Sequence, residues 1–300
     1  MLYSLPALPH LRLRPVRRWK TKVMKNLKYP SVISIAGSDS GGGAGIQADL
    51  KTFSALGCYG TTAITAVTVQ NTMGVSGIFS IPPAIVQAQI KAVIDDICPS
   101  SIKIGMVHSS ELALAISQTL RAYPDLPVVF DPVMVATSGD KLIREDTVSI
   151  LKSTLFPLTT LITPNLDEAE VLAEQAITNV DEMLASAKKL LETGCFAVLL
   201  KGGHLKGEKV YDVYVNQEGR ERVFESEFLA SENLHGTGCT LSSAIAAYLA
   251  MNNNLENAIE KARQYVFDAI RYGSQVKTGS GHGPLNHFFN PHKLQPYEME

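Results

Sequence analysis

The segment Gly236-Thr237-Gly238-Cys239 holds the residues best suited to chemistry in this chain of 300 residues. It reads as a glycine-paired turn that runs straight into an apolar helix predicted over 239–250. Such a turn directs backbone N–H groups and the positive end of a helix dipole at one point, where a phosphate or a developing negative charge is stabilised. The same field lowers the pKa of a thiol, which makes Cys239 a candidate base. The segment predicts phosphoryl transfer.

Asn165 and Glu168 stand three positions apart at a predicted helix start, so both side chains can face one direction. Asp131 follows a neighbouring predicted strand, 128–130, and can add a second carboxylate. Hard oxygen ligands of this kind suit Mg²⁺, which keeps most of its waters and takes few protein groups. The same spacing equally fits a helix cap, with Asn165 as the N-cap and Glu168 as its capping-box partner.

Lys201 follows an apolar strand predicted over 197–200 and precedes Gly202-Gly203. A lysine at a strand end beside a flexible glycine pair suits a contact with a phosphate, and a solvated surface lysine is the alternative. His235 comes directly before the glycine turn and can cap or line it. Three other histidines, His204, His282 and His287, show no spacing typical of a zinc site, and we interpret them as polar groups of loops.

Asp49 lies one turn into a helix predicted over 45–56, and Gln70 ends a strand predicted over 61–69. A primary amide can pair edge-on with an aminopyrimidine, because its carbonyl accepts from the exocyclic amine while its NH2 group donates to a ring nitrogen. A nearby acid can hold a ligand hydroxyl or amine. Taken alone, Asp49 fits a helix-terminus charge and Gln70 a polar strand end; a shared rim would favour the binding role.

The glycine-rich run 41–48 follows a strand and opens a helix, yet it matches neither of two common nucleotide-binding motifs. It lacks the Gly-Lys-Ser/Thr of a P-loop. A dinucleotide fingerprint needs an acid about twenty residues later, and no Asp or Glu lies between Asp49 and Asp95. We interpret the run as a wall against which a flat ligand packs, with a flexible strand-to-helix loop as the alternative.

Short apolar strands alternate with helical stretches from residue 31 onward. Fully apolar strands in such an alternation predict an α/β fold, a three-layer αβα arrangement with a mostly parallel sheet, and here a small β-hairpin at 210–215 and 222–225. The other predicted strands are 32–36, 61–69, 102–104, 128–130, 160–163 and 197–200, and the predicted helices are 45–56, 83–97, 109–121, 144–155, 167–174, 181–192, 239–250 and 255–272.

Ligands bind beyond the carboxyl ends of the strands in sheets of this kind. Each predicted parallel strand is followed by a glycine or a polar residue, so these positions are expected to share one rim and to form one site. They are Gly37, Gln70, Gly105 with Met106, Asp131, Asn165 and Lys201.

Charge is distributed unevenly along the chain. Residues 1–28 hold eight Arg and Lys and no acid, whereas the rest hold 19 basic and 29 acidic residues, a net charge of −10. Such an acidic body is not expected to bind nucleic acid. The basic head is either a targeting peptide or an upstream extension, with Met24 as the practical start of the folded protein. We therefore predict an extension, 1–30, one domain, 31–290, and a tail, 291–300.

Four cysteines lie far apart without a C-x-x-C pair, which favours reduced thiols in the cytoplasm over a disulfide framework or a zinc site. The charge-free run 52–90 is too rich in Thr, Gln, Asn, Gly and Pro to be a membrane span, so no membrane partner is expected. We interpret this run as buried sheet together with a wall of the site.

The motifs together resemble the ribokinase-like superfamily, and more narrowly the hydroxymethylpyrimidine/phosphomethylpyrimidine kinases of thiamin synthesis. The resemblance covers nearly all of 32–289, and only the basic head falls outside it. It rests on Gly236-Thr237-Gly238-Cys239, Asn165-x-x-Glu168, Lys201-Gly202-Gly203-His204, 35–51, Gln70-Asn71-Thr72, 103–106, 131–134, 163–165 and 281–284.

The resemblance implies two successive phosphorylations that use ATP and Mg²⁺, first of a hydroxymethyl group to a monophosphate and then of that monophosphate to a diphosphate. It places Cys239 at the position of the base, where most of the superfamily has Asp. It further assigns Gly236, Thr237 and Gly238 to an anion hole, Gly37, Asp49, Gln70, Met106 and Val133 to the pyrimidine pocket, Asn165, Glu168 and Asp131 to the metal, and Lys201 to the nucleotide phosphates.

Two other functions stay open beside this one. Relatives with the same cysteine also phosphorylate pyridoxal or pyridoxine, so the resemblance allows a vitamin B6 kinase or a dual activity. A non-catalytic binding protein with the same fold would bind pyrimidine without consuming ATP. The resemblance also implies, by analogy, a homodimer.

Overall fold

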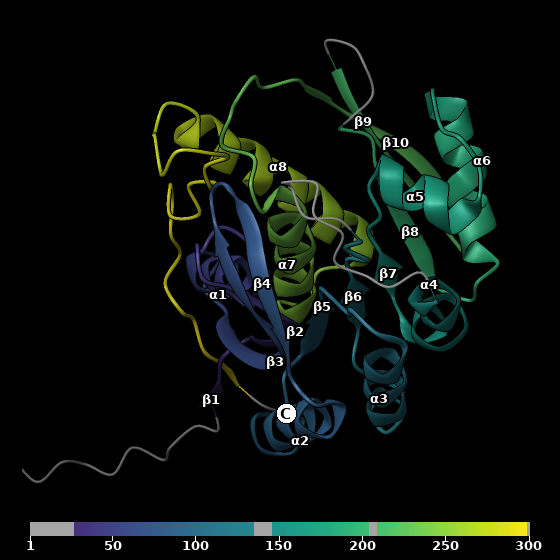
Figure 1. The fold of residues 1–300 in the computed structure, drawn as a ribbon, viewed down its shortest axis with the longest axis vertical. Coiled ribbons are helices and arrows are strands. Elements are labelled where there is room, and N and C mark those ends of the chain that lie inside the picture. Colours follow the sequence, from purple (N-terminus) through teal and green to yellow (C-terminus); the bar gives the residue numbers. More distant parts are fainter. Residues whose placement is uncertain (1–26, 135–145, 204–208, 299–300) are drawn as a thin grey trace, which may run out of the picture.

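The computed structural model describes residues 27–134, 146–203 and 209–298. Within these residues a large sheet lies between two layers of helices (Figure 1). The strands are β1 (Leu27–Lys28), β2 (Ser31–Asp39), β3 (Tyr59–Asn71), β4 (Gly74–Ser80), β5 (Ser101–Ile104), β6 (Val128–Phe130), β7 (Leu161–Ile162), β8 (Ala197–Lys201), β9 (Lys209–Asn216), β10 (Glu221–Glu227) and β11 (Tyr297–Glu298).

The helices alternate with the strands along the chain. They are α1 (Gly45–Ala55), α2 (Pro83–Ile97), α3 (Ser110–Leu120), α4 (Thr147–Ile150), α5 (Leu166–Ala173), α6 (Val180–Leu191), α7 (Thr237–Ala250) and α8 (Leu255–Gly273), with a π-helix at Leu151–Leu155 and a 3₁₀ helix at Phe156–Leu158 directly after α4.

The main sheet has nine strands in the order β10-β9-β8-β7-β6-β5-β2-β3-β4. The six strands from β8 to β3 are parallel. The hairpin of β9 and β10 at one edge and β4 at the other run antiparallel to their neighbours. This arrangement confirms the predicted three-layer fold with its mostly parallel sheet and its hairpin.

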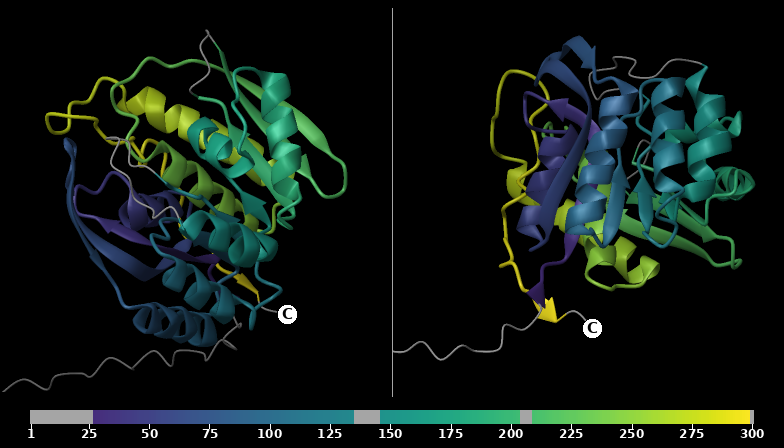
Figure 2. Two further views of the ribbon diagram at one scale, coloured as in Figure 1. Left: turned by 45° about the vertical axis from the view of Figure 1, so that its right-hand side comes forward. Right: turned by 90° about the horizontal axis from the view of Figure 1, so that it is seen from below.

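Successive side chains of each parallel strand enter two different cores, because strand side chains alternate between the faces of a sheet. Ile33 and Ile35 pack with α2, α3, α5 and α6 on one face, whereas Val32 packs with α1, α7 and α8 on the other. Figure 2 shows the two helical layers on opposite sides of the sheet. Burial on both faces explains why the parallel strands read as continuous apolar runs.

The helix α7 is buried on nearly all sides. Eight consecutive residues from Thr240 to Ala247 are buried, including Ser242 and Ser243. A helix that is apolar all round belongs to a core rather than to a surface. The packing around α7 therefore fixes the position of its first turn at the rim of the sheet.

Several predicted elements differ from the observed ones. The strand β4 was not expected, and the charge-free run that contains it is partly an exposed edge of the sheet rather than buried sheet. The predicted helix 144–155 is broken into α4 and a π-helix. Its first two residues, together with His204 and the head up to residue 26, lie outside the described residues.

Residues near the two chain ends meet in a small second sheet. Leu27 and Lys28 pair antiparallel with Glu298 and Tyr297, so a part of the predicted extension pairs with a part of the predicted tail; in Figure 1 the yellow β11 lies beside β1. Among the described residues, no helix combines the length and the apolar character that crossing a bilayer requires.

Candidate active site

One cavity of about 1250 Å³ opens at the carboxyl ends of the parallel strands. The first turn of α7 forms one of its walls, and α8 and the β10 side form another. The shared rim expected from the strand ends therefore exists. Of the site residues expected from the sequence, those that line this cavity are Gly37, Gln70, Met106, Asp131, Val133, Asn165, Glu168, Lys201, Gly236, Thr237, Gly238 and Cys239.

Two glycine loops meet at the base of the cavity. Gly236 caps α7 with a positive φ of 83°, and a Cβ at this position would lie only 1.9 Å from the carbonyl oxygen of Gly43. Only glycine adopts this conformation at this approach without strain. The loop of residues 41–45, which begins α1, therefore packs directly on the residues that begin α7.

A buried Asp39–His235 pair joins the two loops. The Asp39 carboxylate accepts hydrogen bonds from the backbone N–H groups of Gly41, Gly43 and Ala44 and lies 3.0 Å from His235 Nε2. Burial alone would raise the pKa of Asp39, but the hydrogen bonds from His235, Ala44 and Gly41 outweigh it and hold this pKa below its usual value. The sequence predicted that His235 caps or lines the turn, and it lines the cavity; no role was predicted for Asp39.

The Cys239 thiol has a different protonation from the one expected. Burial raises its pKa to about 11, and the nearby carboxylates of Asp49 and Asp131 act in the same direction. The Lys103 ammonium and a backbone hydrogen bond from Gly45 only partly oppose this. The expectation of a lowered pKa is therefore wrong for the ligand-free site, because desolvation outweighs the favourable charges around the thiol.

Asp49, expected in the pocket wall, is fully buried behind it. Both of its carboxylate oxygens lie 2.9 Å from Lys103 Nζ. Ser34 and Ser243 donate to the same carboxylate over 2.5 and 2.6 Å. Burial alone would lower the pKa of Lys103, but Asp49 raises it, so the lysine stays charged. Lys103, which the sequence motif contained without a role, reaches the cavity in place of Asp49.

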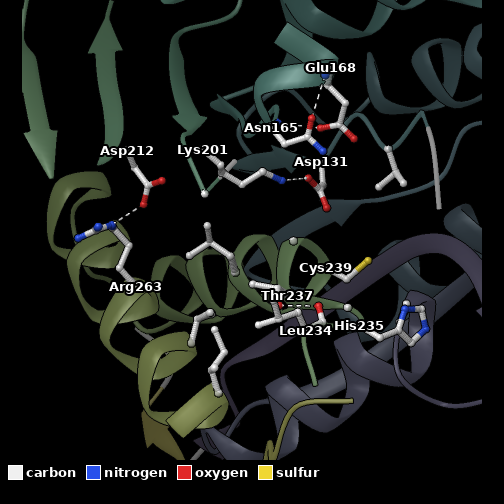
Figure 3. A pocket seen from close by; sticks show the side chains of 18 of the residues that line it. Asp131, Asn165, Glu168, Lys201, Asp212, Leu234, His235, Thr237, Cys239 and Arg263 are labelled. Atoms are coloured by element: carbon white, nitrogen blue, oxygen red, sulfur yellow. Dashed lines mark hydrogen bonds and ion pairs between the residues drawn. The ribbon is translucent and has the colours of Figure 1, made fainter. Parts of the chain in front are cut away.

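Lys201 and Asp131 form a second ion pair, directly above the beginning of α7. Lys201 Nζ lies 2.8 Å from Asp131 Oδ1, and Thr163 donates to the same oxygen. A Cβ on Gly238 would approach Lys201 Nζ to 3.1 Å and Asp131 Oδ2 to 3.3 Å, so a side chain would crowd this pair. Figure 3 shows the pair facing Thr237 and Cys239. The alternative prediction for Lys201, a solvated surface lysine, is therefore wrong.

Asn165 and Glu168 form the capping box that the sequence allowed. Asn165 Oδ1 accepts from the Glu168 N–H, and Glu168 Oε2 accepts from the Asn165 N–H, both over 2.8 Å. Burial raises the pKa of Glu168 to about 7, Asp131 adds to the rise, and Lys201 opposes it. Ionising a buried carboxyl group beside a second carboxylate costs free energy. A divalent cation bound between the two groups would offset that cost.

The far wall of the cavity holds charged groups that the sequence did not single out. Arg263 on α8 donates to Asp212 Oδ2 over 2.7 Å, and Asp212 Oδ1 accepts from the Gly202 N–H. The Arg263 guanidinium also lies 4.9 Å from the centre of the Phe224 ring. No local motif marks these residues, because three separate elements bring them together. The Asp212–Arg263 pair lies on the opposite side of Figure 3 from His235.

A mostly parallel α/β sheet whose rim carries a glycine-started helix, two lysines and buried carboxylates is the arrangement of a ribokinase-like small-molecule kinase. Solved structures with this fold include a pyridoxal kinase from Bacillus subtilis in complex with ADP, 35% identical with a TM-score of 0.80, covering 87% of this chain and 98% of that one. A phosphomethylpyrimidine kinase from Clostridium difficile is 43% identical with a TM-score of 0.71, over 80% and 99% of the two chains.

The chain belongs to the phosphomethylpyrimidine kinase family, whose family description matches residues 39–286. A hydroxymethylpyrimidine/phosphomethylpyrimidine kinase of Rhizobium meliloti is 48% identical over 85% of this chain and 96% of its own length. A bifunctional thiamine biosynthesis protein of Geobacter sulfurreducens is 49% identical over 86% of this chain, which spans about half, 52%, of that longer protein. The family resemblance is thereby confirmed.

The Lys103–Asp49 pair makes a prediction about stability. The variant Lys103→Met leaves the Asp49 carboxylate buried without its cation, which should lower the free energy of unfolding by about 3–5 kcal/mol. The control Lys188→Met breaks an exposed ion pair with Glu221 and should cost at most about 1 kcal/mol. Urea unfolding at neutral pH measures both; equal losses in the two variants would contradict the assignment.

Proposed function

We propose that this protein uses ATP to phosphorylate 4-amino-5-hydroxymethyl-2-methylpyrimidine and then its monophosphate to the diphosphate, in thiamin biosynthesis. Residues 31–290 would form the catalytic domain, and the cytoplasm would be its compartment. One observation carries the proposal: a single cavity joins the amide-rich start of α7, the Lys201–Asp131 pair and the Gln70 amide. The family and its named relatives support it.

The two ends of this cavity suit the two reactants. Gln70 on β3 would offer the edge of an amide to the aminopyrimidine. Gly37 and Met106 line the same cavity, and a Cβ on Gly37 would lie 2.9 Å from Met106 Cε. Lys201 and the backbone N–H groups of residues 236–238 would receive the transferring phosphoryl group. Catalysis would come mainly from holding the two reactants in line and from neutralising charge that develops between them.

Mg²⁺ would be held at Asp131, Glu168 and Asn165. No cluster of three or more His, Cys, Asp or Glu suited to a metal occurs among the described residues. Mg²⁺ takes few protein ligands and keeps most of its waters, and the proposal rests on the family resemblance and on these oxygen-bearing side chains. When bound, Mg²⁺ would neutralise phosphate charge. The capping box of Asn165 and Glu168 would keep both side chains at this end of the cavity.

Cys239 would accept the proton of the substrate hydroxyl. With its pKa raised to about 11, the thiol is mostly protonated at neutral pH. A loose transition state relaxes the demand on the base, because bond breaking to the leaving phosphate runs ahead of proton loss. Lys201 and Lys103 interact electrostatically with Cys239 and favour its thiolate.

The base role predicts a selective loss of turnover. The variant Cys239→Ala should lower kcat by a factor of about 10²–10⁴, the usual contribution of a general base. Its affinity for ATP should match that of the wild-type protein, because the amides of residues 236–238 and Lys201 are untouched. Coupled measurement of ADP release gives kcat, and calorimetry gives ATP affinity. Full turnover in the variant would end the assignment.

The raised pKa of Cys239 also predicts a pH profile. Because the thiolate fraction grows about tenfold per pH unit below the pKa, kcat/KM should climb between about pH 7 and about pH 10. The nearby Lys201, whose pKa is raised by Asp131 and Glu168 against the effect of burial, should stay charged over this range. The slope should vanish in Cys239→Ser. A wild-type profile that is flat or falls above neutral pH would be incompatible with a thiolate base.

A vitamin B6 kinase is the second candidate. It is favoured by the likeness to the B. subtilis pyridoxal kinase. One ADP-release assay with hydroxymethylpyrimidine, its monophosphate and pyridoxal decides between the functions. The proposal expects the two pyrimidines to be turned over faster than pyridoxal. Pyrimidine binding without ATP consumption would instead identify a binding protein.

We also propose that the protein is a homodimer. One face of the β3–β4 hairpin exposes Val67, Val69 and Phe79, with 44, 64 and 69% of each residue accessible. Val67 pairs directly with Phe79 across the two strands. This face belongs to the charge-free run 52–90 and lacks the charges that protect exposed sheet edges. A second copy of the chain, with the same apolar face, would cover it.

The dimer proposal is tested by a single charge on this face. Phe79→Glu should shift the protein from dimer to monomer in light scattering coupled to size exclusion. Val276→Glu places the same charge at another exposed apolar position, 55% accessible, and should leave the dimer intact. A monomeric wild-type protein at all concentrations, or a dimer in Phe79→Glu, would contradict this interface.

A further inference from the structure

The Gln70 amide is held between two polar neighbours at the cavity wall. Its Nε2 atom lies 3.4 Å from His235 Nε2, and its Oε1 atom lies 3.1 Å from Thr68 Oγ1. All three residues line the cavity. The donor and acceptor roles of the two neighbours therefore decide which way round this amide presents its edge to a ligand.

His235 is a donor at Nε2. Asp39 Oδ2 lies 3.0 Å from this nitrogen, and the same carboxylate already accepts from the backbone N–H groups of Gly43 and Ala44. Since the pKa of Asp39 is held low, the group is a carboxylate that can only accept. His235 Nε2 therefore carries a hydrogen. An amide NH2 facing it would set two donors against each other.

Thr68 is an acceptor toward Gln70. A hydroxyl has one hydrogen to donate, and Thr68 Oγ1 lies 2.9 Å from the Ser38 carbonyl oxygen, closer than the amide. Its remaining lone pairs face Gln70. Half a turn about the last side-chain bond exchanges the oxygen and nitrogen of the amide within the same shape. In that orientation Nε2 donates to Thr68, and Oε1 faces His235 Nε2. The one hydrogen on that nitrogen is donated to Asp39, so His235 offers no lone pair to an amide NH2 group there.

We propose that Asp39, His235 and Thr68 fix the polarity of the Gln70 amide, oxygen toward His235 and NH2 toward Thr68, and thereby select the orientation of the pyrimidine ring. His235 and Thr68 are positioning residues that act through Gln70. The inference rests on the proposed function, because it takes the aminopyrimidine as the ligand.

The substrate's own substitution pattern connects this polarity to the reaction. The exocyclic amine on C4 lies between ring nitrogen N3 on one side and C5, which carries the hydroxymethyl arm, on the other. When the amide oxygen on the His235 side accepts from the amine and the NH2 donates to N3, the arm also falls on the His235 side. Cys239 follows His235 by four residues, and Figure 3 shows both on the side of the pocket away from Asp212 and Arg263.

The reversed polarity would turn the hydroxymethyl arm away from His235 and toward Thr68. Only a glycine at position 43 leaves room for the His235 ring, since a Cβ there would lie 2.3 Å from His235 Cδ2. The loop of residues 41–45 thus supports the histidine ring from below and supplies two of the N–H groups that keep Asp39 ionised.

A substrate pair tests the proposal. One substrate is the aminopyrimidine, and the other is 5-hydroxymethyl-2-methylpyrimidine, which lacks the amine. In the wild-type protein, kcat/KM for the aminopyrimidine should exceed that for the analogue about tenfold or more. This ratio is the change expected when one buried hydrogen bond to the substrate is lost. His235→Phe keeps a ring over Gly43 but removes the donor, and Thr68→Val removes the acceptor. In both variants the ratio should fall toward one.

The design separates positioning from general damage. Thr65→Val removes another buried hydroxyl from the same strand, one that donates to the Met106 carbonyl and lies outside the network. Any loss it causes should affect both substrates equally and leave the ratio unchanged. Thr68→Ser, which keeps the hydroxyl, should restore the wild-type ratio. A structural role alone lowers both rates together and does not move the ratio.

Each outcome bears on one of the two claims. A wild-type ratio that persists in both His235→Phe and Thr68→Val overturns the positioning role and leaves the proposed function intact. The same holds for a wild-type protein that phosphorylates both pyrimidines equally well. A wild-type protein that phosphorylates neither overturns the proposed function, and this inference with it.

Discussion

The contact between the loop of residues 41–45 and the turn that starts α7 is the constraint on which the site depends. Neither glycine has room for a side chain, because a Cβ on Gly236 would meet the Gly43 carbonyl oxygen and a Cβ on Gly43 would meet the His235 ring. The Asp39 carboxylate ties the first loop together and meets His235 from the second. Because α7 is buried nearly all round, this contact holds a row of backbone N–H groups at the rim of the parallel strands.

Two ion pairs then shape the electrostatics around Cys239. The Lys103–Asp49 pair is fully buried, with Lys103 at the cavity wall and Asp49 behind it, and the Lys201–Asp131 pair lies against Gly238. Each pair is close to neutral, so the thiol gains little net stabilisation of its charged form and burial decides its pKa. The two ion pairs therefore give the site little net charge. Most of the charge in the occupied site would come from the bound phosphates.

Much of the architecture could be predicted from local patterns, since buried parallel strands appear as continuous apolar runs and tight turns appear as glycine pairs. Because ligands bind at the carboxyl ends of parallel strands, Gln70, Asp131 and Lys201 could be predicted to share one cavity. The capping box at Asn165 could be predicted from its spacing to Glu168. What could not be predicted depends on partners far away in the chain. The burial of Asp49 under Lys103, the Asp39–His235 pair and the raised pKa of Cys239 all arise from tertiary packing, which no local motif encodes.

The most direct test of the account is a crystal structure with hydroxymethylpyrimidine and a non-hydrolysable ATP analogue. The account predicts the terminal phosphate at the backbone N–H groups of residues 236–238, beside Lys201, with the substrate hydroxyl between that phosphate and the Cys239 sulfur. It also predicts the pyrimidine edge on Gln70. A triphosphate bound away from the start of α7, or a pyrimidine on the far wall near Arg263, would contradict it.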